Sequence, residues 1–228
     1  NYQGDTGAHV AKWLWYYKKY SKGSPPKNKE GKWLANIYVK AVKKLTEKPE
    51  LKEQVEQINY NLEHNKDKEL KDLWKKSRKW SLEEFNRIYK ELDAHFDHFF
   101  FERQMEKRGK DIVSSLVKNK IAKVSDGATI VDLKKLGIWV LLRRDGTILY
   151  SAKDLALAEK KFKEFKIDTS IYVVGKAQSL HFQQLFKVLH LMKFPQAKNA
   201  FHLSFDEVRL PTGKMSSRTG ANILYSDL

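Results

Sequence analysis

The chain has 228 residues, of which 41% are apolar and 32% charged, a composition that indicates a folded globular protein with one large hydrophobic core or two small ones. It contains no cysteine, which excludes disulfides, thiolate zinc sites and cysteine nucleophiles. The 44 Lys and Arg outnumber the 28 Asp and Glu, and the net charge of +16 favours an anionic partner, with nucleic acid the first candidate. A lysine-rich proteome would give the same excess, so the charge alone leaves the partner open.

No targeting or membrane signal is visible in the sequence. No apolar run approaches the roughly 18 residues of a membrane span, and the first residues lack the pattern of a signal peptide. We therefore expect no membrane partner and a cytoplasmic location, which the absence of cysteine also fits. The sequence begins at Asn1, inside what looks like a motif, so we expect a piece of a longer polypeptide whose other parts are its partners.

The first part of the chain predicts helices. Residues 1–7 form a tight, glycine-bearing turn, with Asp5 or Thr6 as the expected N-cap of a helix over 8–20. After a loop that contains two prolines and two glycines, an amphipathic pattern predicts a second helix over about 33–45.

The polar stretch 49–87 is highly charged and predicts further helices, with a break near 77–81. Ser81-Leu82-Glu83-Glu84 has the S-x-x-E form of a capping box, which we expect to start a new helix. Two His and two Asp follow within 93–98, but their spacing is not that of a zinc site. We expect aromatic packing there and no metal.

From residue 121 the pattern changes to short apolar runs around Asp-Gly pairs. Ile121–Ser125 and Ala128–Leu133 flank Asp126-Gly127, which is a strong signal for a β-hairpin. The same design recurs where 138–143 and 147–150 flank a second Asp-Gly pair. Two such hairpins predict a small antiparallel sheet.

The last third of the chain alternates helix and strand patterns. A helix over about 152–165 precedes Ser170–Val174, a short apolar run of the kind buried in a parallel sheet, which Gly175 ends. A helix over about 177–192 and a strand over 201–205 follow. We therefore predict an α/β fold: part of a Rossmann-like, parallel-sheet nucleotide-binding domain, with a largely helical insertion and small β-hairpins. Its ligand site is expected at the carboxyl edge of the sheet.

Tyr150 and Asp154 are four positions apart at a junction between strand and helix, so their side chains are expected on the same side. A phenol and a carboxylate in one pocket suit a cationic ligand, and a planar guanidinium best, because it pairs two N–H groups with one carboxylate. Ser151-x-x-Asp154 is also the pattern of a helix capping box. The residues leave both interpretations open.

Gln178 and His181 are three positions apart at the start of the helix that follows Gly175. The positive end of the helix dipole lies there, and two polar side chains on that face are placed to reach a substrate and the adenosine of a nucleotide. For His181 the alternative is a histidine that serves only the core, and the sequence does not decide between the two.

Val208–Gly220 is basic, contains two glycines and has little to bury. Its glycines allow a mobile backbone, and Lys214 and Arg218 are suited to clamp phosphate oxygens. The alternative is an ordinary solvated basic loop. The order Leu-Pro-Thr-Gly-Lys-Met-Ser-Ser-Arg, however, resembles the signature loop with which class I aminoacyl-tRNA synthetases bind the phosphates of ATP.

Four motifs, taken together, resemble the arginyl-tRNA synthetase family. They are Tyr-x-x-x-Asp after an Asp-Gly hairpin, a strand followed by Gly-x-x-Gln-x-x-His-Phe, the Met-Ser-x-Arg loop, and Asn-x-x-Gly-Asp-x-Gly at 1–7. The resemblance implies a class I arginine–tRNA ligase, which activates L-arginine with ATP and attaches it to tRNA(Arg). Mg2+ would accompany the ATP, with no separate metal site on the protein.

The resemblance also implies roles by position. The residues expected to bind arginine are Tyr150, Asp154 and Gln178. Those expected to contact ATP are Gly175, His181, Lys214 and Met215. The residues expected to act in catalysis, by stabilising the phosphates as pyrophosphate leaves, are Lys214, Ser216, Ser217 and Arg218.

By the same resemblance, residues 1–20 would belong to the catalytic core, 21–145 to a helix-rich insertion that ends in the two hairpins, and 146–228 to the second half of the core. The family's His-x-Gly-His motif, which grips ATP, is not in the sequence, and we expect its anticodon-binding domain to be absent as well. We therefore expect the 228 residues alone to be inactive. The alternative is a basic module that binds RNA and keeps a synthetase-like core without catalysis.

Overall fold

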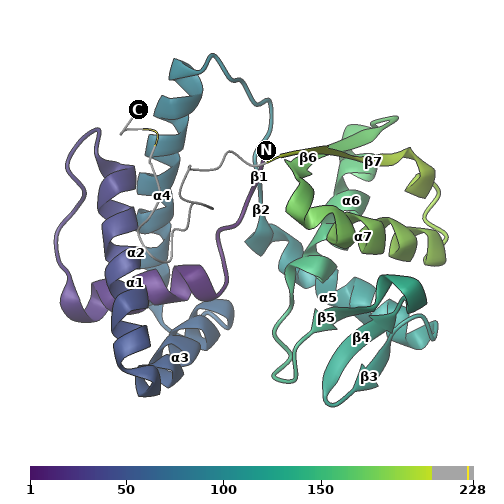
Figure 1. The fold of residues 1–228 in the computed structure, drawn as a ribbon, viewed down its shortest axis with the longest axis horizontal. Helices are drawn as coiled ribbons and strands as arrows, with labels where there is room; N and C mark the ends of the chain where they lie inside the picture. The colour runs from purple at the N-terminus through teal and green to yellow at the C-terminus, as the bar shows by residue number, and fades with distance from the viewer. Residues whose placement is uncertain (207–224, 226–228) are drawn as a thin grey trace. The chain divides into compact units, whose positions relative to one another are not determined.

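The computed structural model describes residues 1–206 and Tyr225, which form two compact units (Figure 1). Residues 1–100, with Tyr225, belong to a helical unit, and residues 101–206 belong to a unit of mixed helices and strands. The predicted division at residues 20 and 145 separates the family's catalytic core from its insertion. The two compact units are a different kind of division and do not test it, so it stays a prediction.

Four α-helices account for most of the described residues 1–100. They are α1 (Ala8–Tyr20), α2 (Glu30–Glu47), α3 (Lys52–Glu63) and α4 (Lys68–Glu91), with a 3-10 turn at Pro49–Leu51. Each contributes to a shared core whose buried side chains include Trp13, Ile37, Leu62 and Trp74. The helices therefore cohere through apolar faces of the kind that the 3.6-residue pattern predicts.

The two ends of the helical unit meet in a short strand contact. The strand β1 (Tyr2–Gln3) leads towards α1, and β2 (Phe100–Phe101) follows α4. The amide of Phe100 donates to the carbonyl of Asn1 at 2.8 Å. The amino-terminal segment is therefore anchored to the far end of the unit.

The helix α4 runs without a break from Lys68 to Glu91, so the expected new helix at Ser81 is wrong. Its N-cap is Asp67, whose carboxylate accepts a hydrogen bond from the amide of Leu70 at 2.9 Å. Leu70, Trp74 and Trp80 lie along α4 and all join the same core. This continuous apolar face stabilises helix where the local S-x-x-E pattern predicts a start.

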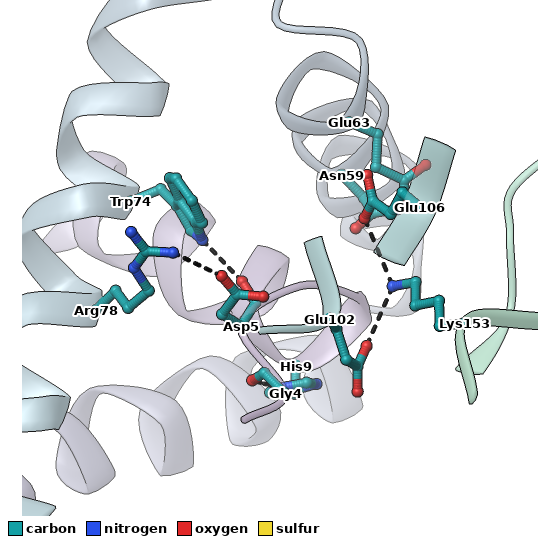
Figure 2. A network of polar contacts seen from close by, with 10 residues as sticks. All are labelled: Gly4, Asp5, His9, Asn59, Glu63, Trp74, Arg78, Glu102, Glu106 and Lys153. Atoms are coloured by element: carbon teal, nitrogen blue, oxygen red, sulfur yellow. Dashed lines mark hydrogen bonds and ion pairs between the residues drawn. The ribbon is translucent and has the colours of Figure 1, made fainter. Parts of the chain in front are cut away.

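The expected cap of α1 by Asp5 or Thr6 is also wrong. The cap position is Gly7, whose φ of 101° lies in the region that favours glycine, and no side chain bonds there. Asp5 is buried and pairs with Arg78 at 2.8 Å, while Nε1 of Trp74 donates to the Asp5 carbonyl at 2.7 Å (Figure 2). The Asn-x-x-Gly-Asp-x-Gly element therefore ties the start of α1 to α4.

The second unit begins with α5 and a small antiparallel sheet. The bounds are α5 (Glu102–Lys118), β3 (Lys123–Ser125), β4 (Ala128–Asp132) and β5 (Ile138–Leu142), with the strands in that order across the sheet. Asp126 and Gly127 have φ values of 48° and 78°, as a tight Asp-Gly turn requires. The first predicted hairpin is confirmed.

The second predicted hairpin forms only in part. The amide of Arg143 donates to the carbonyl of Thr147 at 2.9 Å, which closes the turn. Beyond it, Ile148 makes an isolated bridge to Leu142 and no strand. A helix begins already at Tyr150, which leaves too few residues to continue the pairing, and β5 pairs with β4 instead.

A β–α–β unit completes the second unit. Its elements are α6 (Tyr150–Phe165), β6 (Ser170–Gly175), α7 (Ser179–Leu191) and β7 (Ala200–Phe205), with 3-10 turns at Lys176–Gln178 and Ala197–Asn199. β6 and β7 are parallel, and α7 is the helix of the crossover between them (Figure 1). The predicted α/β fold with a partial parallel sheet is confirmed.

The helix α5 lies close against the first turn of α6. Gly109 permits this approach, because a Cβ there would meet the carbonyl oxygen of Ala152 at 3.0 Å. The buried amine of Lys153 lies 3.1 Å from Glu102 and 3.5 Å from Glu106, both on α5 (Figure 2). These contacts fix the position of the turn that carries Tyr150 and Asp154.

Candidate functional site

Tyr150 is the first residue of α6, and Asp154 follows one turn later. Ser151 donates to the carbonyl of Val140 in β5, and no side chain caps α6. The capping-box alternative for Ser151 and Asp154 is therefore excluded. The carboxylate of Asp154 is used elsewhere.

The partner of Asp154 is His181, on α7. Oδ2 of Asp154 lies 2.7 Å from Nε2 of His181, and the two residues are 27 positions apart in the sequence. The side chains are 12% and 8% exposed, so the pair lies inside the unit. The structure thus brings together two residues that the sequence assigned to separate tasks, one to arginine and one to ATP.

Three aromatic rings surround the imidazole of His181. The ring centroids of Tyr150, Phe182 and Trp139 lie 4.8, 5.2 and 5.7 Å from that of His181. Tyr150 is 51% exposed, whereas Trp139 and Phe182 are buried. Of these three rings, Tyr150 is therefore the one that is open to solvent.

A second polar group lies near Asp154. Lys161 lies about two turns beyond Asp154 on α6. It donates to the hydroxyl of Ser170 at 2.6 Å, and its amine is 3.7 Å from the centroid of the Tyr172 ring. Burial lowers the pKa of Lys161 to about 8, and the negative charge of Asp154 opposes that shift. Burial also raises the pKa of the Tyr172 hydroxyl, and Asp154 adds to that rise. The charge of Asp154 therefore favours the protonated form of both groups.

Among the described residues, the other predicted site residues make no side-chain hydrogen bond or ring contact with the pair of Asp154 and His181. Gln178 ends the 3-10 turn before α7 and is exposed, and Gly175 ends β6 at the carboxyl edge of the sheet. His181 lies one turn of chain beyond Gln178 but points into the unit, since it is buried. The predicted phosphate-binding and catalytic residues Lys214, Met215, Ser216, Ser217 and Arg218 lie outside the described residues.

Two polar contacts near the site were missed by reasoning from the sequence. Gln184 is buried, and its amide donates to the carbonyl of Leu136 at 2.7 Å, which joins α7 to the turn between β4 and β5. Lys153 is buried, and its amine contacts Glu102 and Glu106 of α5. Their positions in the helical pattern could have indicated these contacts. Both residues lie on the helix faces that carry buried apolar side chains, and a buried polar group there requires a partner.

Within residues 1–206 and Tyr225, no three His, Asp or Glu side chains gather as a metal ion would require. His95 and Asp93 are 3.9 Å apart, but both are almost fully exposed. No helix of these residues has the length and apolar content needed to cross a membrane.

A buried carboxylate and a half-exposed phenol that both contact His181, near the start of the helix that follows β6, suit a cationic ligand. The family model for the catalytic domain of class I (R) tRNA synthetases matches residues 1–228. The chain belongs to this family. The resemblance carried by the four motifs is confirmed over the whole chain.

Curated relatives of this synthetase family agree. The chain is 41% identical over 227 residues to the arginine–tRNA ligase of Bdellovibrio bacteriovorus, a match that covers 96% of the chain and 39% of that ligase. It is 37% identical over 235 residues to the arginine–tRNA ligase of Treponema denticola, covering 100% of the chain and 40% of the ligase. The chain thus spans about two fifths of the length of these relatives.

Solved structures show the same fold. The arginyl-tRNA synthetase of Thermus thermophilus matches with a TM-score of 0.72 at 22% identity, covering 97% of the chain and 43% of that structure. The enzyme of Plasmodium falciparum matches with a TM-score of 0.68 at 19% identity, covering 89% and 34%. At these identities the likeness is one of fold, and it confirms the class I synthetase architecture.

Proposed function

We propose that the protein carrying this chain activates L-arginine with ATP and attaches it to tRNA(Arg). Family membership supports the reaction class, and one observation supports the choice of amino acid: the buried carboxylate of Asp154 and the half-exposed ring of Tyr150 both contact His181. A guanidinium is planar and presents paired N–H donors, so it makes a bidentate contact with a carboxylate. It also stacks on an aromatic face, which Tyr150 offers.

The other residues complete the proposed pocket. Gln178, exposed at the start of α7, would bind the polar end of the arginine. Gly175 and His181 would border ATP, together with Lys214 and Met215. The groups that would stabilise the phosphates are Lys214, Ser216, Ser217 and Arg218, by charge and hydrogen bonds.

The proposed reaction has two steps, and neither forms a bond to the protein. In the first, a carboxylate oxygen of arginine attacks the α-phosphorus of ATP in line. The bond from the α-phosphorus to the oxygen that bridges it to the β-phosphorus breaks, and pyrophosphate leaves with that oxygen and the bonding electrons. In the second, a hydroxyl of the terminal ribose of tRNA attacks the arginyl carbonyl carbon, and AMP leaves. The protein contributes positioning and charge stabilisation.

Magnesium enters this proposal with the nucleotide. The described residues offer no cluster of three metal ligands, and Mg2+ is commonly held by substrate phosphates and water with few protein ligands. We therefore propose that Mg2+ neutralises charge on the ATP phosphates. We further propose that the protein works in the cytoplasm, where translation uses charged tRNA.

The test is arginine-dependent exchange between ATP and pyrophosphate by the full-length protein. Arginine should support exchange, whereas lysine and citrulline should not, because the first has a single ammonium and the second has a neutral urea in place of the guanidinium. Exchange that does not depend on arginine would contradict the proposal. A protein that binds RNA but catalyses no exchange would be the non-catalytic RNA-binding module instead.

A further inference from the structure

His181 is an imidazole with one nitrogen engaged and one without a partner. Nε2 lies 2.7 Å from Oδ2 of Asp154, while Nδ1 is buried and has no hydrogen-bond partner among the described residues. A buried polar atom without a partner costs free energy. Phenylalanine or leucine would fill such a space without that cost, so the feature that requires a histidine here is the contact made by Nε2.

The contact fixes which atoms donate and which accept. We assign the imidazole proton to Nε2, which then donates to Oδ2 of Asp154, because an ionised carboxylate only accepts hydrogen bonds. Among the described residues, His181 is the one donor within hydrogen-bond distance of this carboxylate. Oδ1 therefore keeps both lone pairs, and Oδ2 keeps one, for a ligand.

We propose that His181 is a positioning residue for arginine recognition, which holds the plane of the Asp154 carboxylate in the orientation that a guanidinium needs. This inference rests on the proposed function, because it takes Asp154 as the partner of the guanidinium. It gives His181 a task towards the amino acid, in addition to its proposed place beside ATP.

The physical reason is the freedom of the aspartate side chain. The last torsion of aspartate has a broad distribution, so an Asp154 without a partner samples many carboxylate orientations. A bidentate contact requires the carboxylate and the guanidinium to lie in one plane. A donor fixed in advance removes that freedom before arginine binds, which lowers the entropy cost of binding.

His181 is itself held firmly enough to act as such a donor. Its ring lies 5.2 Å from that of Phe182 and 5.7 Å from that of Trp139, both buried, and its backbone is in α7. The same N–H gives a charge-assisted hydrogen bond to a carboxylate that burial has stripped of most of its water. Position and charge stabilisation thus come from one atom.

The test compares two substitutions in the full-length protein, with arginine and ATP dissociation constants measured separately by calorimetry. His181→Gln keeps an amide N–H that reaches about as far from the backbone as Nε2. His181→Phe keeps an aromatic ring for packing and for any contact with adenosine, but loses the donor. We expect His181→Phe to weaken arginine binding on the order of 10- to 100-fold, the usual effect of losing a charge-assisted hydrogen bond. His181→Gln should recover most of that loss, and ATP affinity should change less than arginine affinity in both.

Melting temperatures of both variants separate positioning from general damage. A purely structural histidine would give equal losses for arginine and ATP, or equal effects of Gln and Phe, and either result would overturn the inference. Asp154→Asn is the parallel control: if it leaves arginine affinity unchanged, the proposed arginine pocket itself is wrong. If Asp154→Asn weakens arginine binding but His181→Phe does not, only the positioning role of His181 is refuted.

Discussion

The amine of Lys161 lies 3.7 Å from the centroid of the Tyr172 ring, with the hydroxyl of Ser170 as its acceptor at 2.6 Å. Among the described residues, no carboxylate lies within ion-pair distance of this amine. Burial lowers the pKa of Lys161 to about 8, against an ordinary value of 10.5. The folded protein therefore holds this proton less tightly than the unfolded chain does.

The sign of the pH dependence follows from that difference. Between about pH 8 and 10.5 the unfolded chain binds more protons at Lys161, so this residue's contribution to stability rises with pH across that window. Below pH 8 both states are protonated and the penalty is constant. Lys161→Met removes the penalty, and we expect a gain in the free energy of unfolding of up to about 3 kcal/mol at pH 7 that vanishes towards pH 10.5.

Urea unfolding at pH 7 and pH 9.5 checks this expectation. Lys187→Met is the control, since Lys187 is an exposed lysine on α7 and its replacement should have the same small effect at both values. A Lys161→Met effect that does not change with pH would show that the lysine is not destabilised in the fold.

Lys153 should be among the residues least tolerant of neutralisation. Its amine lies between the carboxylates of Glu102 and Glu106, with a side chain only 5% exposed. Lys153→Met leaves two partly buried carboxylates without that cation, and we expect the free energy of unfolding to fall by about 3–5 kcal/mol. The matched change Lys160→Met breaks an exposed pair with Glu164 on the same helix and should cost below about 1 kcal/mol. Equal effects of the two substitutions in urea unfolding would refute the structural role of Lys153.

Gly109 should not tolerate a methyl group. A Cβ there would meet Cδ1 of Ile148 at 2.6 Å and the carbonyl oxygen of Ala152 at 3.0 Å, and the backbone of α6 cannot move away as a flexible side chain would. We expect Gly109→Ala to lower stability by about 1–3 kcal/mol, despite the higher helix propensity of alanine. Ser114→Ala, at an exposed position of α5, gains propensity without the clash and should be neutral or stabilising. Thermal unfolding of the two variants decides between these outcomes.

The basic segment 208–220 should act on the nucleotide and not on the amino acid. Lys214→Ala and Arg218→Ala remove charges proposed to stabilise the departing pyrophosphate, so each should slow arginine-dependent exchange by about 100-fold or more. Arginine affinity measured without ATP should stay within a few-fold of the unsubstituted protein. A loss of arginine affinity comparable with that of Asp154→Asn would remove the proposed division of labour.

Local patterns predicted the elements whose stability is decided locally. The Asp126-Gly127 hairpin forms because the turn residues themselves favour φ > 0. The parallel strands β6 and β7 follow from short apolar runs separated by a helix. The capping box at Ser81 failed because the apolar face of α4 continues through it, a property of packing that a four-residue pattern does not contain.

One part of the candidate site, the pair of residues on α6, could likewise be predicted from the sequence. Helical spacing placed Tyr150 and Asp154 on one side of α6, because four residues make about one turn. The same spacing says nothing of what that side faces. The contact between Asp154 and His181 joins two helices 27 positions apart, and it depends on how α7 returns from the parallel sheet.

We expect the carboxylate of Asp154 to bind the guanidinium of arginine directly, and this contact to decide the choice of amino acid. Citrulline has nearly the same shape as arginine but a neutral urea in place of the cation, so the ratio of their dissociation constants isolates that contact. The most direct measurement is this ratio for the full-length protein and for Asp154→Asn, which has nearly the same shape as aspartate without the charge. We expect the unsubstituted protein to prefer arginine by about 100-fold or more, and Asp154→Asn to reduce the preference to a few-fold. An arginine preference that survives Asp154→Asn unchanged would contradict a guanidinium-binding role for Asp154.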